Sequence, residues 1–189
     1  MGKLPEAEAA ASAGQHLRVL ELLGRWPGPL AMYLRTPEGQ ALGPESRAAL
    51  ARALGVLGSS CVALARVQQG EEILRLGIQY AQEGPSAGEL FLRLGRSQLL
   101  HGREGEAIGP LRHALRLGAP SVHVLPLLAR SFIARARWVA ALACLRHARE
   151  AGVPREELLE QEELVAQALG PLTRALPPEL RLSSDLSHD

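Results

Sequence analysis

The sequence predicts an all-α protein built from repeated helix hairpins. Two observations lead to this fold class: a period of 34 residues within 88–154, and a composition that is 47% hydrophobic but only 3% aromatic. The residues that recur at this period are Leu94 and Leu128, Ala107 and Ala141, Leu111 and Leu145, Ala114 and Ala148, Gly118 and Gly152, and Pro120 and Pro154. A fixed period of this length is typical of helix–turn–helix repeats. The composition favours Ala and Leu packing between helices over a β-rich core.

The N-terminal segment, 1–26, is expected to form a pair of helices. Pro5 suits a first helical turn, Gly14 breaks the first run, and leucines then recur at helical spacing. This arm is expected either to cap the stack of repeats or to bind elsewhere. Residues 27–44 are rich in proline and glycine, which predicts a loop that links the arm to the repeats.

The repeat region is expected over 45–154, as about three helix hairpins. A degenerate unit occupies 45–87, and two clear units occupy 88–121 and 122–154. Helix A of the clear units is expected at about 88–101 and 122–135, and helix B at about 104–117 and 138–151. Small residues at the repeated positions would let the backbones of helices A and B approach closely.

The degenerate unit is expected to follow the same period less closely. Its first helix is predicted from Pro44 to about Gln68, with a break at Gly70 and a partner helix after it. At a spacing of 34, Tyr80 falls on the position that Ala114 occupies in the next unit. Because tyrosine is too large for a small-residue position, looser packing is expected there.

The C-terminal segment 155–176 is expected to cap the stack. Its helix would carry glutamates on one side and leucine and valine on the other, and a terminal helix with a polar outer face suits the end of a repeat array. Prolines at 171, 177 and 178 then stop regular structure. Residues 177–189 are expected to be disordered.

The clear units resemble the tetratricopeptide repeat (TPR) family. The pattern that carries the resemblance is Phe91-x-x-Leu94-Gly95, then Gly102, then Ala107-x-x-x-Leu111-x-x-Ala114. The second clear unit departs from it, because Leu125 replaces the aromatic residue and Ala129 the glycine. The resemblance implies an α-solenoid with a concave groove that binds an extended or helical peptide. Length and layout also resemble the small TPR chaperones of bacterial type III secretion.

The resemblance places one stripe of helix A in this groove. The stripe comprises Leu92, Arg96, Leu99 and Arg103, then Pro126, Arg130, Ile133 and Arg137, with Val62 in the degenerate unit. A spacing of four, three and four keeps such residues on one face of a helix. Two columns of guanidinium groups with apolar residues between them would suit a peptide that has acidic and apolar side chains. The alternative is that these arginines stay solvated or pair with nearby acids such as Glu104 and Glu106.

A non-enzymatic adaptor or chaperone that binds a peptide segment of a partner protein is therefore the expected function. The alternative is a structural scaffold that self-associates as a homodimer, with the N-terminal arm of one copy in the groove of another. No catalytic, cofactor-binding or metal site is expected, because the six histidines lack metal-ligand spacing and no nucleophile or phosphate-binding motif occurs.

Charge and hydrophobicity limit the expected partners further. A net charge of +1 gives no general attraction for nucleic acid or for a membrane surface. No apolar run reaches about 18 residues, so no membrane insertion is expected. Cys61 and Cys144 cannot make a disulfide framework and are expected to be buried thiols in a reducing compartment. A cytoplasmic location follows as the expectation.

Overall fold

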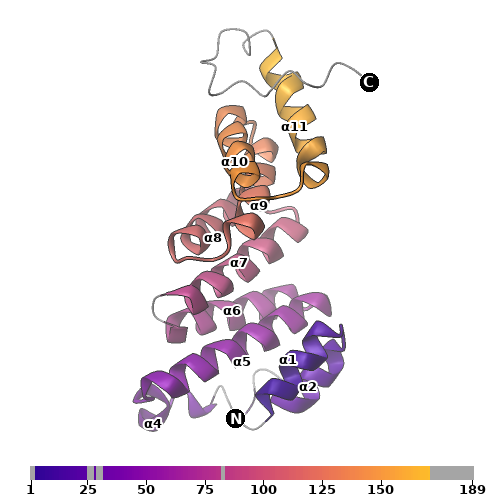
Figure 1. Ribbon diagram of the computed structural model, residues 1–189. Helices are drawn as coiled ribbons and strands as arrows, with labels where there is room; N and C mark the ends of the chain where they lie inside the picture. The colour runs from indigo at the N-terminus through magenta and orange to yellow at the C-terminus, as the bar shows by residue number, and fades with distance from the viewer. Residues whose placement is uncertain (1–2, 25–27, 29–31, 82–83, 171–189) are drawn as a thin grey trace.

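The computed structural model describes residues 3–24, 28, 32–81 and 84–170, and this part of the chain is all-helical, as predicted (Figure 1). Ten helices and no strand lie within it. The helices are α1 (Leu4–Ser12), α2 (His16–Leu23), α4 (Pro37–Gln40), α5 (Pro44–Ala63), α6 (Val67–Ala81), α7 (Pro85–Leu100), α8 (Glu104–Arg116), α9 (Ser121–Ala134), α10 (Trp138–Glu150) and α11 (Arg155–Leu169).

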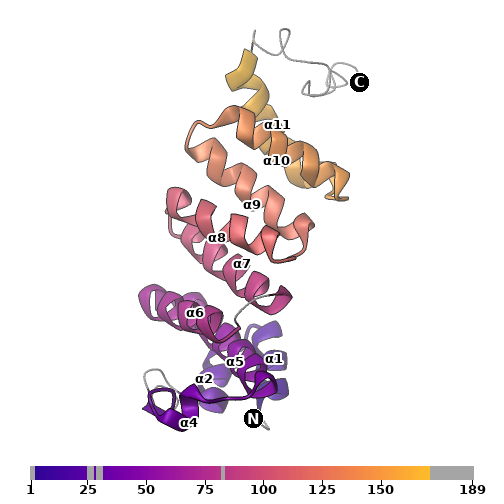
Figure 2. The same ribbon diagram turned by 90° about the vertical axis from the view of Figure 1, so that its left-hand side faces the viewer.

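The helices from α5 onward form an elongated stack in chain order (Figures 1 and 2). Helix α5 packs on α6, α7 on α8, and α9 on α10, and each pair contacts the next. The α1–α2 hairpin docks on α5 at one end, and α11 packs on α10 and α9 at the other. The helix α4 lies within the predicted loop at 27–44, where the Thr36 hydroxyl accepts a hydrogen bond from the Gly39 amide (3.1 Å). The predicted tail, 177–189, lies outside the described residues.

One type of turn closes α5, α7 and α9. The second residue after each helix has a left-handed backbone: Ala65 (φ 61°), Gly102 (φ 68°) and Ala136 (φ 54°). The next amide donates to the carbonyl five residues back, in the pairs Arg66 to Cys61 (2.8 Å), Arg103 to Gln98 (2.9 Å) and Arg137 to Phe132 (2.8 Å). These bonds satisfy carbonyls that a helix end would otherwise leave unpaired.

The turns define the repeat register, and they correct the prediction for the degenerate unit. Gly84, Gly118 and Gly152 all have positive φ and are spaced 34 residues apart, but Ala65 and Gly102 are spaced 37 apart. The difference lies in α6, which has 15 residues whereas α8 and α10 have 13 each. The predicted break at Gly70 is wrong, because α5 ends at Ala63 and Gly70 lies inside α6.

A spacing of 37 also restores the pattern of small residues in α6. Gly70, Leu74 and Gly77 take the positions that Ala107, Leu111 and Ala114 take in α8. The contacts agree: a Cβ on Gly58 would lie 2.8 Å from Leu74 Cγ, and a Cβ on Gly95 would lie 2.6 Å from Leu111 Cγ. Tyr80 therefore does not occupy a small-residue position.

Helices α5 and α6 cross at two facing glycines. A Cβ on Gly58 would lie 2.8 Å from the Gly70 carbonyl oxygen, and a Cβ on Gly70 would lie 2.6 Å from the Gly58 oxygen. Neither backbone has room for a methyl group at this crossing. The close approach brings α6 against α5, so that Leu54, Leu57 and Ile73 share one fully buried cluster.

Candidate functional site

Two of the predicted groove residues belong to the core instead. Leu92 and Leu99 are only 4% and 3% exposed, and both pack in a cluster with Ala107 and Leu111 of α8. The prediction that they line an open groove is wrong, because this face of α7 is the one turned toward α8. Leu94, which was expected to face helix B, packs instead in the cluster between α5, α6 and α7.

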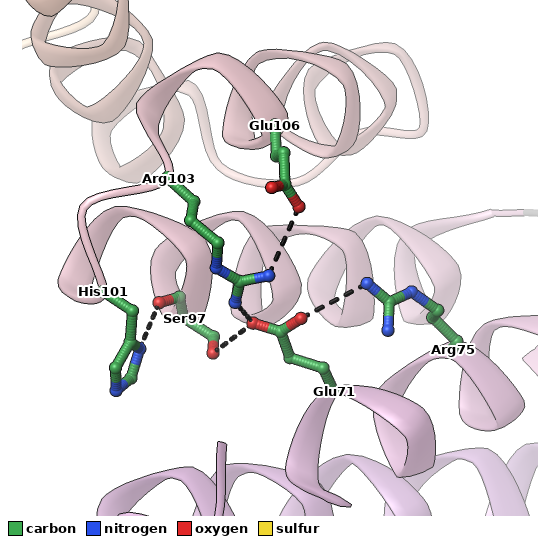
Figure 3. Close-up of polar contacts among 6 residues, drawn as sticks. All are labelled: Glu71, Arg75, Ser97, His101, Arg103 and Glu106. Atoms are coloured by element: carbon green, nitrogen blue, oxygen red, sulfur yellow. Dashed lines mark hydrogen bonds and ion pairs between the residues drawn. The ribbon is translucent and has the colours of Figure 1, made fainter. Parts of the chain in front are cut away.

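Arg103 is held by an internal network of charges (Figure 3). Its guanidinium forms ion pairs with Glu71 of α6 and with Glu106 of α8 (3.3 Å). The hydrogen bond to Glu71 raises the pKa of Arg103. The alternative interpretation, in which arginines of the stripe pair with nearby acids, thus holds for Arg103, which fixes the turn between α7 and α8.

The carboxylate of Glu71 is the centre of this network. Glu71 is buried, with 3% exposure, and accepts hydrogen bonds from the Ser97 hydroxyl (3.0 Å) and from Arg75 (3.2 Å) in addition to Arg103. His101 Nδ1 donates to the Ser97 carbonyl (2.7 Å). A buried carboxylate needs such partners, because burial without them costs several kcal/mol. The network therefore ties α6, α7 and α8 together.

The other predicted arginines remain available for binding. Arg96, Arg130 and Arg137 are exposed, and none forms an ion pair with a carboxylate in the described part of the chain. The three remaining predicted residues, Val62, Pro126 and Ile133, are half-buried. Ile133 packs against the core cluster of α9 and α10.

A groove lies between the N-terminal arm, α5 and α7, and we call it the arm groove. It consists of two adjoining cavities of about 450 Å³ and 370 Å³. The two cavities share the lining residues Ala11, Ser12, Glu89 and Arg93, so they form one continuous channel. Of the predicted site residues, only Val62 and Arg96 are found among the lining residues of these two cavities.

The wall that α7 contributes is a stripe adjacent to the predicted one. Its members are Glu89, Arg93, Arg96 and Leu100, which follow the same four, three and four spacing. Arg93 Nε donates to Glu89 (3.0 Å), and its NH1 lies 3.5 Å from the Ser59 hydroxyl on α5. Leu100 is 66% exposed at the end of the stripe. The groove therefore combines a free guanidinium at Arg96 with an apolar surface.

The wall opposite α7 comes from α1. Ala7, Ala10 and Val19 of the arm pack with Val56 of α5 in a small buried cluster. His16 Nδ1 lies 3.3 Å from the hydroxyl of Ser60, which is buried. The arm thus completes the groove along its own chain, and it does so through contacts with α5.

The exposed stripe of α7 continues on α9. Adding 34 to Glu89, Arg93, Arg96 and Leu100 gives His123, Leu127, Arg130 and Ala134, and all four of these are exposed or half-buried. The spacing of the turns shows that this register is correct, since Gly102 and Ala136 are also 34 apart. Because α7 contacts α9, Arg96 and Arg130 stand at equivalent places on neighbouring helices.

Reactive chemistry has little support among the described side chains. Burial raises the pKa of the Cys144 thiol to about 11, and burial also raises that of Cys61, so both stay protonated near neutral pH. Within residues 3–24, 28, 32–81 and 84–170, no three His, Cys, Asp or Glu side chains are grouped as metal ligands.

Comparison with known proteins gives no relative. No family model matches the sequence, and neither the curated proteins nor the solved structures give a match. Among the described helices, none combines the length and the hydrophobicity needed to cross a bilayer. Interpretation of the site therefore rests on its own geometry.

Proposed function

We propose that this chain is a TPR-like α-solenoid that binds a peptide segment of a partner protein in the arm groove, as an adaptor or chaperone. The observation that carries the proposal is the continuous channel between α1, α5 and α7, which ends beside the unpaired guanidinium of Arg96. The recurring turns at Ala65, Gly102 and Ala136 support the solenoid. A cytoplasmic location is part of the proposal, and it agrees with two free cysteines.

The lining of the groove defines the kind of peptide it suits. Val56, Val62 and Leu90 give apolar surface along the channel, and Leu100 adds an exposed side chain at its end. Buried apolar contact supplies affinity at about 25 cal/mol for each Å² removed from water. Arg96 adds a planar pair of donors for a carboxylate. A peptide with apolar and acidic side chains fits both features.

A filled groove tests this function. A random peptide library is first selected against the purified full-length chain, and the Kd of a selected, labelled peptide is measured by fluorescence anisotropy. Ala63→Trp places an indole in the channel from an exposed position, so we expect at least a tenfold loss of affinity. The matched control is Ala9→Trp, on an exposed face of α1, where affinity should change less than twofold. Selection of no peptide, or equal binding by both variants, would reject the function.

A self-associating scaffold is the second candidate, and exposed apolar side chains near the arm favour it. Leu17 and Met32 are 65% and 74% exposed, and Tyr33 is 44% exposed. If this surface pairs two copies, light scattering will give the mass of a dimer, and Leu17→Glu combined with Met32→Glu will give a monomer. A monomeric mass for the unmodified chain over the micromolar range would remove this candidate.

A further inference from the structure

The arginines near the arm groove divide into paired and unpaired ones. Arg52 lies 3.9 Å from Glu8, Arg93 pairs with Glu89, and Arg103 pairs with Glu71. Arg96 and Arg130 are exposed and form no ion pair within the described residues. These two guanidinium groups are therefore the ones on the stripe that a ligand's carboxylates can engage.

The spacing of these two groups follows from the register. Arg96 and Arg130 occupy equivalent positions on α7 and α9, which are in contact. Axes of packed helices lie roughly 10 Å apart. A ligand that engages both arginines must therefore present two carboxylates at about this separation, on the same side of its chain.

Two backbone conformations meet that condition. A polyproline II segment rises about 3.1 Å per residue with three residues per turn, so residues i and i+3 share one face about 9 Å apart. An α-helix would need residues i and i+7, about 10.5 Å apart. An α-helix with its side chains is roughly 10–12 Å across. Two turns of such a helix exceed either cavity of the arm groove, about 450 Å³ and 370 Å³. The channel therefore favours the extended form.

We propose that the ligand is an acidic peptide segment in a polyproline II conformation, with two carboxylates at positions i and i+3 that pair with Arg96 and Arg130. The inference rests on the proposed function and specifies its partner chemistry. Apolar side chains that flank the acidic pair would contact Leu100 beside Arg96 and Leu127 beside Arg130, which are exposed and half-buried respectively.

Labelled synthetic peptides of three kinds test the spacing on the full-length chain. One carries Glu-Pro-Pro-Glu between flanking leucines, one carries Glu-Pro-Glu, and one carries Gln-Pro-Pro-Gln. Anisotropy should show that Glu-Pro-Pro-Glu binds at least tenfold more tightly than the other two peptides. An alanine-rich helical peptide with glutamates at i and i+7 is included. Tighter binding of the helical peptide, or equal binding of the two spacings, would overturn the inference.

Charge-reversed variants show whether the named arginines carry the effect. Arg96→Glu and Arg130→Glu should each weaken Glu-Pro-Pro-Glu binding at least tenfold while hardly affecting Gln-Pro-Pro-Gln. The matched control, Arg112→Glu on an exposed face of α8, makes the same change in net charge and should alter Kd less than twofold. Circular dichroism confirms that each variant is folded. Equal losses in all three variants would indicate only a general electrostatic field and would refute the pairing.

The failure of this inference can be separated from failure of the proposed function. If library-selected peptides bind and lose affinity with Ala63→Trp, whereas Glu-Pro-Pro-Glu does not bind, the groove function stands and the acidic ligand is wrong. If no peptide of either source binds, both are wrong.

Discussion

The buried carboxylate of Glu71 is the residue on which three helices converge. It lies 97% out of solvent contact by exposure (3%), and its oxygens accept from Arg103, Arg75 and Ser97. Nothing in the sequence pattern predicts this, because Glu71 lies 32 residues from Arg103 and has no acidic counterpart in the later units, where Ile108 and Leu142 take its place. Long-range charge pairs need coordinates to be identified.

Arg103→Ala should destabilise the fold by about 2 kcal/mol, because it removes charged hydrogen bonds from a buried acid. Arg75→Ala is the control: its side chain is 53% exposed, so the loss should stay below about 1 kcal/mol. Urea unfolding followed by circular dichroism measures both free energies of unfolding. Equal losses for the two variants would show that Arg103 has no special part in holding Glu71.

The thiols give a second prediction at this scale. Burial raises the pKa of Cys144 to about 11, so the folded state retains its proton where a free thiol, at about 8.5, has lost it. The stabilising contribution of this group is present below pH 8.5 and is lost as pH rises through 11. At pH 8, Ellman's reagent should therefore react much more slowly with the folded chain than with the chain in 8 M urea. Equal rates would contradict the burial of both thiols.

Among the elements, the two clear units were predicted more closely than the rest. Their helices follow from a period of 34 residues, and the observed turns at Gly102, Gly118 and Gly152 lie in the predicted connections. The degenerate unit was misread because α6 is longer and because its break falls at Ala65, an alanine with positive φ. Sequence punctuation points to glycine, whereas here the glycine at 70 serves a helix crossing.

The groove stripe was misplaced for a different reason. A spacing of four, three and four fits two adjacent faces of α7, and the two stripes share Arg96. The predicted set was 92, 96, 99 and 103, and the observed set is 89, 93, 96 and 100. Periodicity shows which residues lie together on a helix, but the direction of that face depends on the packing of α7 against α5 and α8.

Substitutions of two helical glycines test the α5–α6 crossing. Gly70→Ala should destabilise by about 1–3 kcal/mol, since the new methyl group would lie 2.6 Å from a backbone oxygen. Gly109→Ala is the counterpart within α8, where nothing lies within 4 Å, and it should stabilise by roughly 0.5–1 kcal/mol through lower backbone entropy. The melting temperatures should move in opposite directions, and a shift of the same sign would contradict the assigned contact.

At the scale of the whole molecule, each helix from α5 onward contacts only its neighbours along the stack. Stability in such an array is close to a sum of units and their interfaces. A disturbance should therefore remain local instead of spreading through one common core. This is also why the arm groove, at one end, can be altered without loosening α10 or α11.

Leu145→Ala tests this locality. Leu145 is fully buried in the cluster of α9, α10 and α11, so truncation should cost about 2–5 kcal/mol. Hydrogen exchange measured by mass spectrometry should accelerate in α9–α11 and change little in α5 and α6. Uniform acceleration along the chain would show that the stack unfolds as one cooperative body.

Matched turns also make the molecule extensible. Gly118 and Gly152 have the same backbone sense and the same place in their units, so a second copy of 119–152 would begin and end in phase with what surrounds it. Such an insertion would add one rung, and with it another arginine in line with Arg96 and Arg130. The chain would then act as a ruler, reading longer acidic tracts in steps set by the thickness of a single hairpin.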